Sequence, residues 1–186
     1  MGKKIWFLTG NLGKVKEAKQ HLQKLGYDVE QLVVDVEITE PQADNIKAVA
    51  EAKITQALPH LPNENDMLLV EDAGLFIEHL NGFPGVYSAY ALNTIGCNGV
   101  LKLLAHLESE DPVMNGQMRS AEFQAVAALW TGEGMLFGNG VCPGWISQKI
   151  DGEGGFGFDP IFIPFDLDAI GKPLAPGNYG ETSTHG

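Results

Sequence analysis

Basic residues are scarce in this sequence of 186 residues. Lys and Arg together number 12 against 24 Asp and Glu, which gives a formal net charge of −12, and Arg119 is the one arginine. Proteins that bind DNA or RNA in general use Lys and Arg to displace counterions from the phosphates. We therefore predict no nucleic-acid partner. A phosphate ligand would have to be held by lysine, by backbone N–H groups or by a metal ion.

Cysteine and long apolar runs are also scarce. Cys97 and Cys142 are too few for a disulfide framework or a zinc site, so we expect two free thiols in a reducing compartment. The apolar run at residues 5–8 is too short for the core of a signal peptide. No stretch approaches the roughly 18 apolar residues of a membrane span. The sequence predicts a cytoplasmic protein with no membrane partner.

The remaining composition is that of a globular chain, with 44% hydrophobic and 19% charged residues. Its length suits a single domain over residues 1–186. Strand patterns at 5–8, 29–36 and 67–70 alternate with helical periodicity at 14–25, 43–58 and 98–107. Residues 108–119 read as a polar loop, and strands are expected at 121–130, 135–138 and 141–149. This order predicts an α/β fold with a mixed sheet.

A candidate anion-binding loop joins the first strand to the first helix. It consists of Thr9, Gly10, Asn11, Leu12, Gly13 and Lys14. Backbone N–H groups and a helix N-terminus converge at such a junction, and that point favours anions. The pattern is not Walker A, because G-x-x-x-x-G-K-[ST] has a longer gap between its glycines. We predict a phosphate loop; the alternative is a plain strand–helix turn with an exposed lysine.

Carboxylates follow the second and third predicted strands. Glu71 and Asp72 come directly after residues 67–70, while Glu37 and Glu40 lie on either side of Ile38 and Thr39. Ligands of open α/β sheets bind at the carboxyl ends of strands, so acids and anion loop share one cleft if the first and third strands are neighbours. Carboxylates beside a polyphosphate need a divalent cation such as Mg²⁺, and one of them can deprotonate water. The alternatives are solvated acidic turns.

A glycine-rich segment at 152–157 matches G-x-G-x-x-G by letter. The dinucleotide fingerprint must open a helix, whereas an extended run follows here, so we reject that site. In this segment Phe156 and Phe158 could stack on a base while Asp159 accepts a hydrogen bond from it. From the residues alone, the interpretation that both rings belong to the core is favoured. The five histidines show no metal-ligand spacing; His21 lies within a predicted helix, and the other four are expected at the surface or in loops.

Five short motifs occur in order along the chain: T-G-N-x-x-K from Thr9, I-T-E-P-Q from Ile38, V-E-D-A-G-L from Val70, G-F-P-G-V-Y-S from Gly82 and G-F-G-F-D-P-I-F from Gly155. Each motif alone is weak, but the ordered set resembles the ITPase/HAM1 family of inosine/xanthosine triphosphate pyrophosphatases. The resemblance implies an elongated mixed sheet flanked by helices, two lobes with a central cleft, and a homodimer.

The resemblance also implies an activity and a site. The activity is Mg²⁺-dependent hydrolysis (with Mn²⁺ as a substitute) of the deaminated purine triphosphates ITP, dITP and XTP to the monophosphate and pyrophosphate, which cleans the nucleotide pool. The substrate would contact residues 9–14, Lys53 and Ala73, and the nucleoside would contact Phe156, Gly157, Phe158 and Asp159. Glu40 and Asp72 would hold the metal with help from Glu71, and Asp72 would be the general base.

The sequence departs from the family at its end. The family continues with a helix carrying a lysine and then a Ser-His-Arg motif that helps to select the base, whereas this sequence ends in Ser183, Thr184, His185 and Gly186. We expect the C-terminal family motif to be missing. Two alternatives therefore stay open: a Maf-like pyrophosphatase for other modified nucleotides, and a nucleotide-binding relative without turnover.

Overall fold

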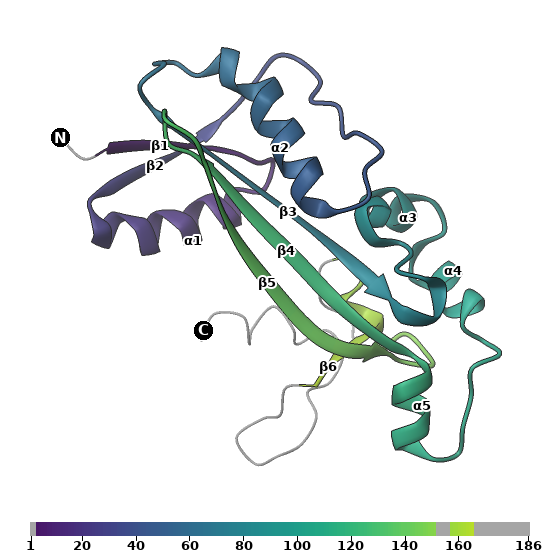
Figure 1. Cartoon of the computed structure of the whole chain (residues 1–186). Helices are drawn as coiled ribbons and strands as arrows, with labels where there is room; N and C mark the ends of the chain where they lie inside the picture. Colours follow the sequence, from purple (N-terminus) through teal and green to yellow (C-terminus); the bar gives the residue numbers. More distant parts are fainter. Residues whose placement is uncertain (1–2, 152–156, 166–186) are drawn as a thin grey trace. The chain divides into compact units, whose positions relative to one another are not determined.

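The computed structural model describes residues 3–151 and 157–165, and the chain divides into two compact units. The first unit comprises residues 1–72 and 125–140, and the second comprises 73–124 and 141–186. The described strands form a six-stranded sheet in the order β2-β1-β3-β4-β5-β6 (Figure 1). Strand β1 pairs in parallel with β2 and β3, whereas β5 and β6 are antiparallel. The sheet is open and mixed, which confirms the predicted α/β class.

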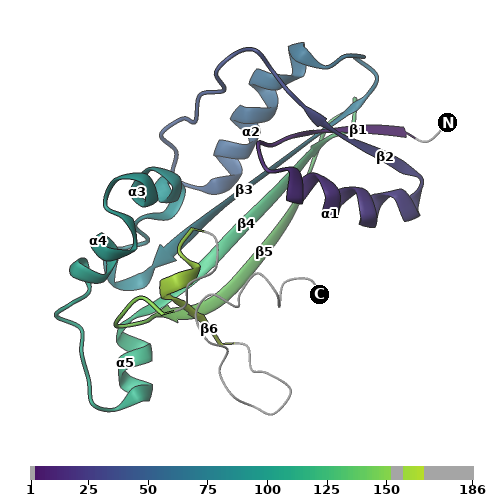
Figure 2. The ribbon, with the colours of Figure 1, turned by 180° about the vertical axis from the view of Figure 1, so that it is seen from behind.

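The first unit is built from alternating strands and helices. They are β1 (Lys3–Leu8), α1 (Leu12–Leu22), β2 (Tyr27–Leu32), α2 (Ile46–Ala57) and β3 (Met67–Ile77), with short 3-10 helices at Gln23–Leu25 and Leu58–His60. The chain steps outward from β1 to β2 and then back past β1 to β3. Right-handed crossovers in opposite directions place their helices on opposite faces of a sheet. Figure 2 shows α1 and α2 on opposite sides of these strands.

The core of the first unit follows the predicted periodicity. Buried side chains of the parallel strands pack against one apolar stripe of α1: Ile5, Phe7, Val29 and Met67 meet Val15, Ala18 and Leu22. Helix α2 buries five apolar side chains at helical spacing: Ile46, Val49, Ala50, Ile54 and Ala57. Gly26, at φ +86°, ends the first helical segment in the left-handed conformation that favours glycine.

Three predicted boundaries in the first unit were wrong. The second strand ends at Leu32, where its pairing with β1 ends, and Val33 beyond it is 73% exposed. Helix α2 begins only after Asn45, whose side chain caps it by accepting a hydrogen bond of 2.9 Å from the Ala48 N–H. The third strand does not stop at Val70 but continues to Ile77.

The second unit combines short helices with the ends of long strands. Its elements are α3 (Ser88–Thr94), α4 (Gly96–Leu103), α5 (Pro112–Met118) and β6 (Phe162–Pro164), and it shares β3, β4 (Ser120–Trp130) and β5 (Met135–Ile146) with the first unit. Its core gathers fully buried side chains from most of these elements: Leu75, Ile77, Val100, Leu104, Ile146, Ile161 and Phe162. The Phe123 and Phe162 rings pack edge to face, with their centroids 4.7 Å apart.

The predictions for this unit missed a helix and divided a strand. Residues 108–119 contain α5, which Asp111 caps by accepting from the Val113 N–H at 2.9 Å, with Pro112 in the first turn. The strands expected at 135–138 and 141–149 are one strand, β5, because its glycines do not form a turn. The helix expected at 98–107 ends at Leu103 and is preceded by a separate helix, α3.

Arg119 is buried in the second unit and is 1% exposed. Its guanidinium donates four hydrogen bonds to backbone oxygens: Nε to Ile146 (2.7 Å), Nη1 to Leu104 (2.8 Å) and Leu107 (3.2 Å), and Nη2 to Ser147 (2.7 Å). Burial lowers the pKa of Arg119, and the carboxylate of Glu108 partly offsets this. The one arginine of the chain therefore ties two segments of the second unit together.

The two cysteines are free thiols, as predicted. The Cys97 thiol is half-buried and donates to the Gly157 carbonyl at 3.6 Å, and burial raises the pKa of this thiol. Within residues 3–151 and 157–165, none of the helices has the length and apolar character needed to cross a membrane.

Candidate active site

The residues that the sequence predicts to be functional lie where β1 ends beside its neighbour β3. We call this place the β1–β3 edge. The parallel register pairs Leu8 with Val70, so Thr9 and Glu71 come next on the two neighbouring strands. The condition that the first and third strands be neighbours is therefore met. The chain passes from β1 to β2 on one side and then returns to form β3 on the other side of β1. The β1–β3 edge is therefore the switch point at which open α/β sheets bind ligands.

Glu71 and Asp72 lie inside β3 and not in a loop after it, which corrects the prediction. Successive side chains of a strand point to opposite faces of the sheet. Glu71 accordingly pairs with Lys14 of α1 at 2.7 Å, and Asp72 lies 3.5 Å from Lys53 of α2. The two adjacent acids thus pair with lysines from two different helices.

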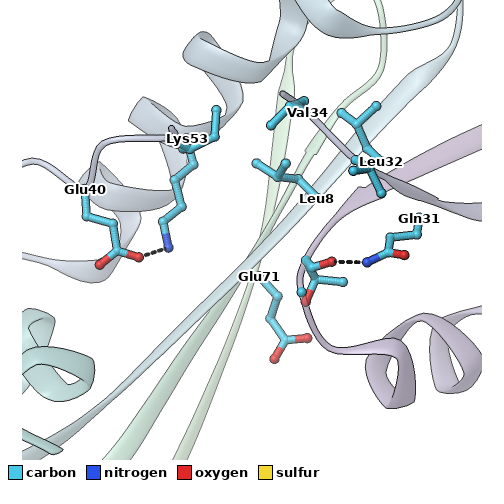
Figure 3. A pocket seen from close by; sticks show the side chains of 11 residues that line it. Leu8, Gln31, Leu32, Val34, Glu40, Lys53 and Glu71 are labelled. Atoms are coloured by element: carbon cyan, nitrogen blue, oxygen red, sulfur yellow. Dashed lines mark hydrogen bonds and ion pairs between the residues drawn. The ribbon is translucent and has the colours of Figure 1, made fainter. Parts of the chain in front are cut away.

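Lys53 bridges two carboxylates. Its Nζ lies 2.5 Å from Glu40 Oε1 and 3.5 Å from Asp72 Oδ1. The side chain of Lys53 is 14% exposed and that of Asp72 is 20% exposed, whereas Glu40 is about half exposed. Figure 3 shows Lys53 reaching from α2 toward Glu40. A single cation thus reaches both carboxylates, one from a loop and one from a strand.

The loop that carries Glu40 is held by a residue that the sequence analysis did not single out. The side chain of Gln56 on α2 accepts from the Thr39 N–H at 2.9 Å and donates to the Thr39 carbonyl at 2.7 Å. Gln56 lies three residues after Lys53, so both project from neighbouring positions on one helix. That spacing was visible in the sequence, but its target in the loop was not.

A pocket of about 420 Å³ opens beside these groups. Thr9, Glu40, Lys53 and Glu71 supply polar lining, and Leu8, Leu32, Val34 and Ile38 supply apolar lining. The Gln31 amide donates to the Thr9 carbonyl at 2.8 Å, which fixes the start of the loop against β2. The volume and mixed lining are typical of a small-molecule site.

The predicted anion loop is shaped by its own side chains. Asn11 Oδ1 accepts from the N–H groups of Gly13 (2.9 Å) and Lys14 (3.4 Å), and Thr9 Oγ1 accepts from the Asn11 N–H (3.1 Å). Asn11 is therefore the N-cap of α1 and already occupies two of the N–H groups at this terminus. An anion here would rely on the Thr9 hydroxyl, the Lys14 ammonium and the positive end of the helix dipole.

The five charged side chains carry one more negative than positive charge, with two lysines against the carboxylates of Glu40, Glu71 and Asp72. In the part of the chain that the structure describes, no three His, Cys, Asp or Glu side chains gather closely enough to hold a metal ion. At this edge Lys53 pairs with Glu40 and Asp72, and Lys14 pairs with Glu71.

The remaining candidate residues belong to the second unit or lie outside the described residues. Ala73, Gly157, Phe158 and Asp159 are in the second unit, and Phe156 is outside the described ranges, as is the segment from Ser183 to the end. The Phe158 ring is 3% exposed and packs in the core, which favours the core alternative for this ring. Asp159 is also buried, at 8% exposure.

The fold and this edge together define an open α/β protein with a charged small-molecule pocket at the switch point of its sheet. Residues 5–172 match the family model described as the Ham1 family. This chain therefore belongs to the Ham1 family.

Relatives in this family are substantially similar over most of their length. The dITP/XTP pyrophosphatase of Thermococcus kodakarensis is 42% identical over 165 residues, which cover 89% of this chain and 82% of that protein. The dITP/XTP pyrophosphatase of Methanopyrus kandleri is 43% identical over 168 residues, with 89% and 81% covered.

Solved structures have the same fold. A nucleoside-triphosphatase (dITP/XTP pyrophosphatase) from Mycobacterium abscessus superposes with a TM-score of 0.72 at 26% identity, covering 97% of this chain and 92% of that one. A HAM1 protein from Coxiella burnetii gives a TM-score of 0.75 at 25% identity, covering 98% and 90%. The likeness extends over nearly the whole chain and matches the fold that the motifs implied.

Proposed function

We propose that this chain is a Mg²⁺-dependent pyrophosphatase that hydrolyses ITP, dITP and XTP to the nucleoside monophosphate and pyrophosphate. The observation that carries the proposal is the pocket at the β1–β3 edge, which Glu40, Lys53 and Glu71 line and from which Lys53 also reaches Asp72. Membership of the Ham1 family and relatives named dITP/XTP pyrophosphatase supply the substrate class.

The lysines are the proposed phosphate ligands. Lys53 lines the pocket and Lys14 follows the loop that begins at Thr9, so both reach the same edge of the sheet. The only arginine of the chain is committed to backbone carbonyls of the second unit, so lysine must supply the positive side chains. The hydroxyl of Thr9 adds a donor at the start of the loop.

The donor set at this edge fits a divalent ion. The Lys53 ammonium stands in for such an ion, since it contacts the carboxylates of both Glu40 and Asp72. Carboxylate oxygens are the protein ligands that Mg²⁺ prefers, usually together with water and substrate phosphates. We assign Glu40 and Asp72 as the metal-binding pair, with Glu71 paired with Lys14. When bound, the ion would neutralise phosphate charge and polarise a phosphoryl oxygen.

The proposed chemistry is attack by water on the anhydride that joins the α- and β-phosphates. A new P–O bond forms to the water oxygen, the α–β bridging bond breaks, and pyrophosphate leaves with the bond's electron pair. Asp72 takes the proton of the attacking water as general base. Lys14 and Lys53 orient the phosphates and stabilise the negative charge on the leaving group.

The ion pairs imply an exchange of partners on substrate binding. Lys53 pairs with the two carboxylates that would hold the metal, so its ammonium would leave Glu40 and Asp72 for the phosphates when metal and substrate are both bound. Metal and triphosphate should then bind with positive cooperativity, because each removes a competing partner from the other's ligands.

The first test replaces the proposed base at nearly constant shape. Asp72→Asn should lower kcat for ITP by about 10²–10⁴-fold, the usual contribution of a positioned acid or base. The substitution Asp44→Asn, in the exposed loop before α2, is the matched control and should leave kcat unchanged. Near-normal turnover by Asp72→Asn would contradict the assignment, provided that its melting temperature shows a folded chain.

The open alternatives give different results in the same assay. A Maf-like enzyme would prefer modified pyrimidine or methylated nucleotides over ITP and XTP. A relative without turnover would bind ITP, seen as a rise in melting temperature, without releasing pyrophosphate. The Ham1 family match favours the purine pyrophosphatase over both.

We further propose that the enzyme is a cytoplasmic homodimer without a nucleic-acid partner. The free thiols are compatible with a reducing compartment, and the net charge of −12 disfavours nucleic acid. Consecutive elements of the second unit expose apolar side chains suited to self-association: Tyr87, Tyr90, Ile95 and Leu103. Light scattering during size-exclusion chromatography would show a mass of two chains, and a mass of one chain would contradict the dimer.

A further inference from the structure

Two histidines of the second unit meet at the surface. His79 lies in a 3-10 turn (Glu78–Leu80) and His106 follows α4, and both side chains are exposed. Their Nε2 atoms are 3.4 Å apart, with ring centroids 5.4 Å apart and ring planes inclined at 57°. The pair is separated by 27 residues in the sequence, so no local spacing pattern marks it.

Hydrogen bonds within the second unit fix the backbone that carries each imidazole. The turn that carries His79 is closed by hydrogen bonds from the Asn81 N–H to the Glu78 carbonyl (3.0 Å) and from the Gly82 N–H to the Ile77 carbonyl (2.9 Å). On the other side, Arg119 Nη1 binds the carbonyls of Leu104 and Leu107, which bracket His106. The two backbone positions are therefore fixed before any ligand arrives.

The distance between the two nitrogens suits a shared metal ion better than a direct hydrogen bond. A separation of 3.4 Å exceeds the usual range of about 2.7–3.2 Å for protein N–H donors. A tetrahedral ion with metal–nitrogen bonds of about 2.0–2.1 Å places its nitrogen ligands about 3.3–3.4 Å apart. Each ring would carry its proton on Nδ1 and present the Nε2 lone pair to the ion.

We propose that His79 and His106 form a two-imidazole site for a transition-metal ion of the Zn²⁺ class. Among residues 3–151 and 157–165 no cluster of three potential ligands exists, so water completes the coordination. The site differs in chemistry from the carboxylate pair Glu40 and Asp72, because imidazole favours Zn²⁺, Ni²⁺ or Cu²⁺ and carboxylate favours Mg²⁺. Glu78 and Glu108, close in sequence to the two histidines, add negative charge that favours a cation.

Calorimetric titration of the full chain with Zn²⁺ in excess Mg²⁺ tests the proposal. The Mg²⁺ fills the carboxylate site and leaves the imidazoles open. We expect one Zn²⁺ per chain, with affinity at least tenfold lower in His79→Ala and in His106→Ala. The double variant should be no weaker than either single variant, because either change alone destroys the chelate.

The control is a histidine outside the pair, and three results would contradict the proposal. His60→Ala removes an exposed histidine of the first unit and should leave Zn²⁺ affinity unchanged. The proposal is overturned if His79→Ala and His106→Ala bind Zn²⁺ as the wild type does, or if the wild type binds none. It is also overturned if His60→Ala weakens binding as much as the pair variants. Both pair positions are exposed, so the melting temperatures should match the wild type without Zn²⁺.

Discussion

Each charged side chain at the β1–β3 edge forms an ion pair. Substrate or metal would replace its partner. Lys53 pairs with Glu40 and Asp72, and Lys14 pairs with Glu71. Lys53 and Asp72 are mostly buried, whereas Glu40 is about half exposed and Lys14 and Glu71 are about a third exposed, so solvent screens these ion pairs only in part. Their value here is to keep anionic and cationic ligands close together before binding.

Replacement of Lys53 by methionine separates its two proposed roles. Lys53→Met should weaken triphosphate binding about 10–100-fold, as expected for loss of a charged hydrogen bond of about 1.5–3 kcal/mol. The same change should strengthen binding of Mg²⁺ alone, since Glu40 and Asp72 lose their competing cation. Calorimetry of both ligands measures the two effects.

The control for that variant lies on the same helix. Lys47→Met, exposed on α2 and stacked 4.5 Å from the centre of the Phe137 ring, should change neither affinity. Weaker Mg²⁺ binding in Lys53→Met would contradict the exchange of partners, even if triphosphate binding fell.

Arg119 is a single residue with a structural role. Arg119→Met removes four hydrogen bonds to backbone carbonyls of the second unit and should lower the free energy of unfolding by about 3–5 kcal/mol. Arg119→Lys should recover only part of the loss, because an ammonium cannot reproduce the planar fork. Urea unfolding measures both, with exposed Lys102→Met as the control. A loss below about 1 kcal/mol in Arg119→Met would contradict this role.

At the scale of elements, a close approach in the second unit constrains β5. A Cβ added to Gly144 would meet the Ile163 carbonyl oxygen and the Phe162 ring on the neighbouring strand β6. Gly144→Ala should therefore cost about 1–3 kcal/mol of stability through overpacking. Gly140→Ala on the same strand meets nothing within 4 Å and should change stability by less than about 0.5 kcal/mol. Equal unfolding midpoints in urea for the two variants would contradict this packing.

Local sequence signals predicted the elements whose side chains follow one period. The partly buried apolar stripe of Val15, Ala18 and Leu22 marked α1, and the helical spacing of Val49 and Ile54 marked α2. The same local reasoning recognised residues 9–14 as a strand–helix junction that could bind an anion. It could not establish that β1 and β3 are neighbours, because strand order depends on long-range pairing.

The errors occurred where tertiary pairing overrides local preference. Glu71, Asp72 and Gly74 are poor strand formers, yet pairing in the sheet keeps β3 extended through all three. The polar character of residues 108–119 suggested a loop, but the segment contains the helix Pro112–Met118, which Asp111 caps. The contacts of Gln56 with the Glu40 loop and of His79 with His106 join distant segments, so no short pattern predicts them.

At the scale of the whole molecule, an acidic chain must bind an anionic substrate. A net charge of −12 repels a triphosphate at long range, so binding depends on short-range lysines and on a cation that accompanies the substrate. This argues for recognition of a metal–triphosphate complex at a single charged edge. It also agrees with membership of the Ham1 family, whose model spans residues 5–172.

The proposed activity is measured as pyrophosphate release by the wild-type chain. The substrates are ITP, XTP, dITP, GTP and ATP, each with Mg²⁺ and with EDTA, and both pyrophosphate and orthophosphate are measured. We expect Mg²⁺-dependent pyrophosphate release from ITP, dITP and XTP well above that from GTP or ATP, without release of orthophosphate. Release of orthophosphate, or no hydrolysis of any of these nucleotides by a chain with a cooperative melting transition, would contradict it.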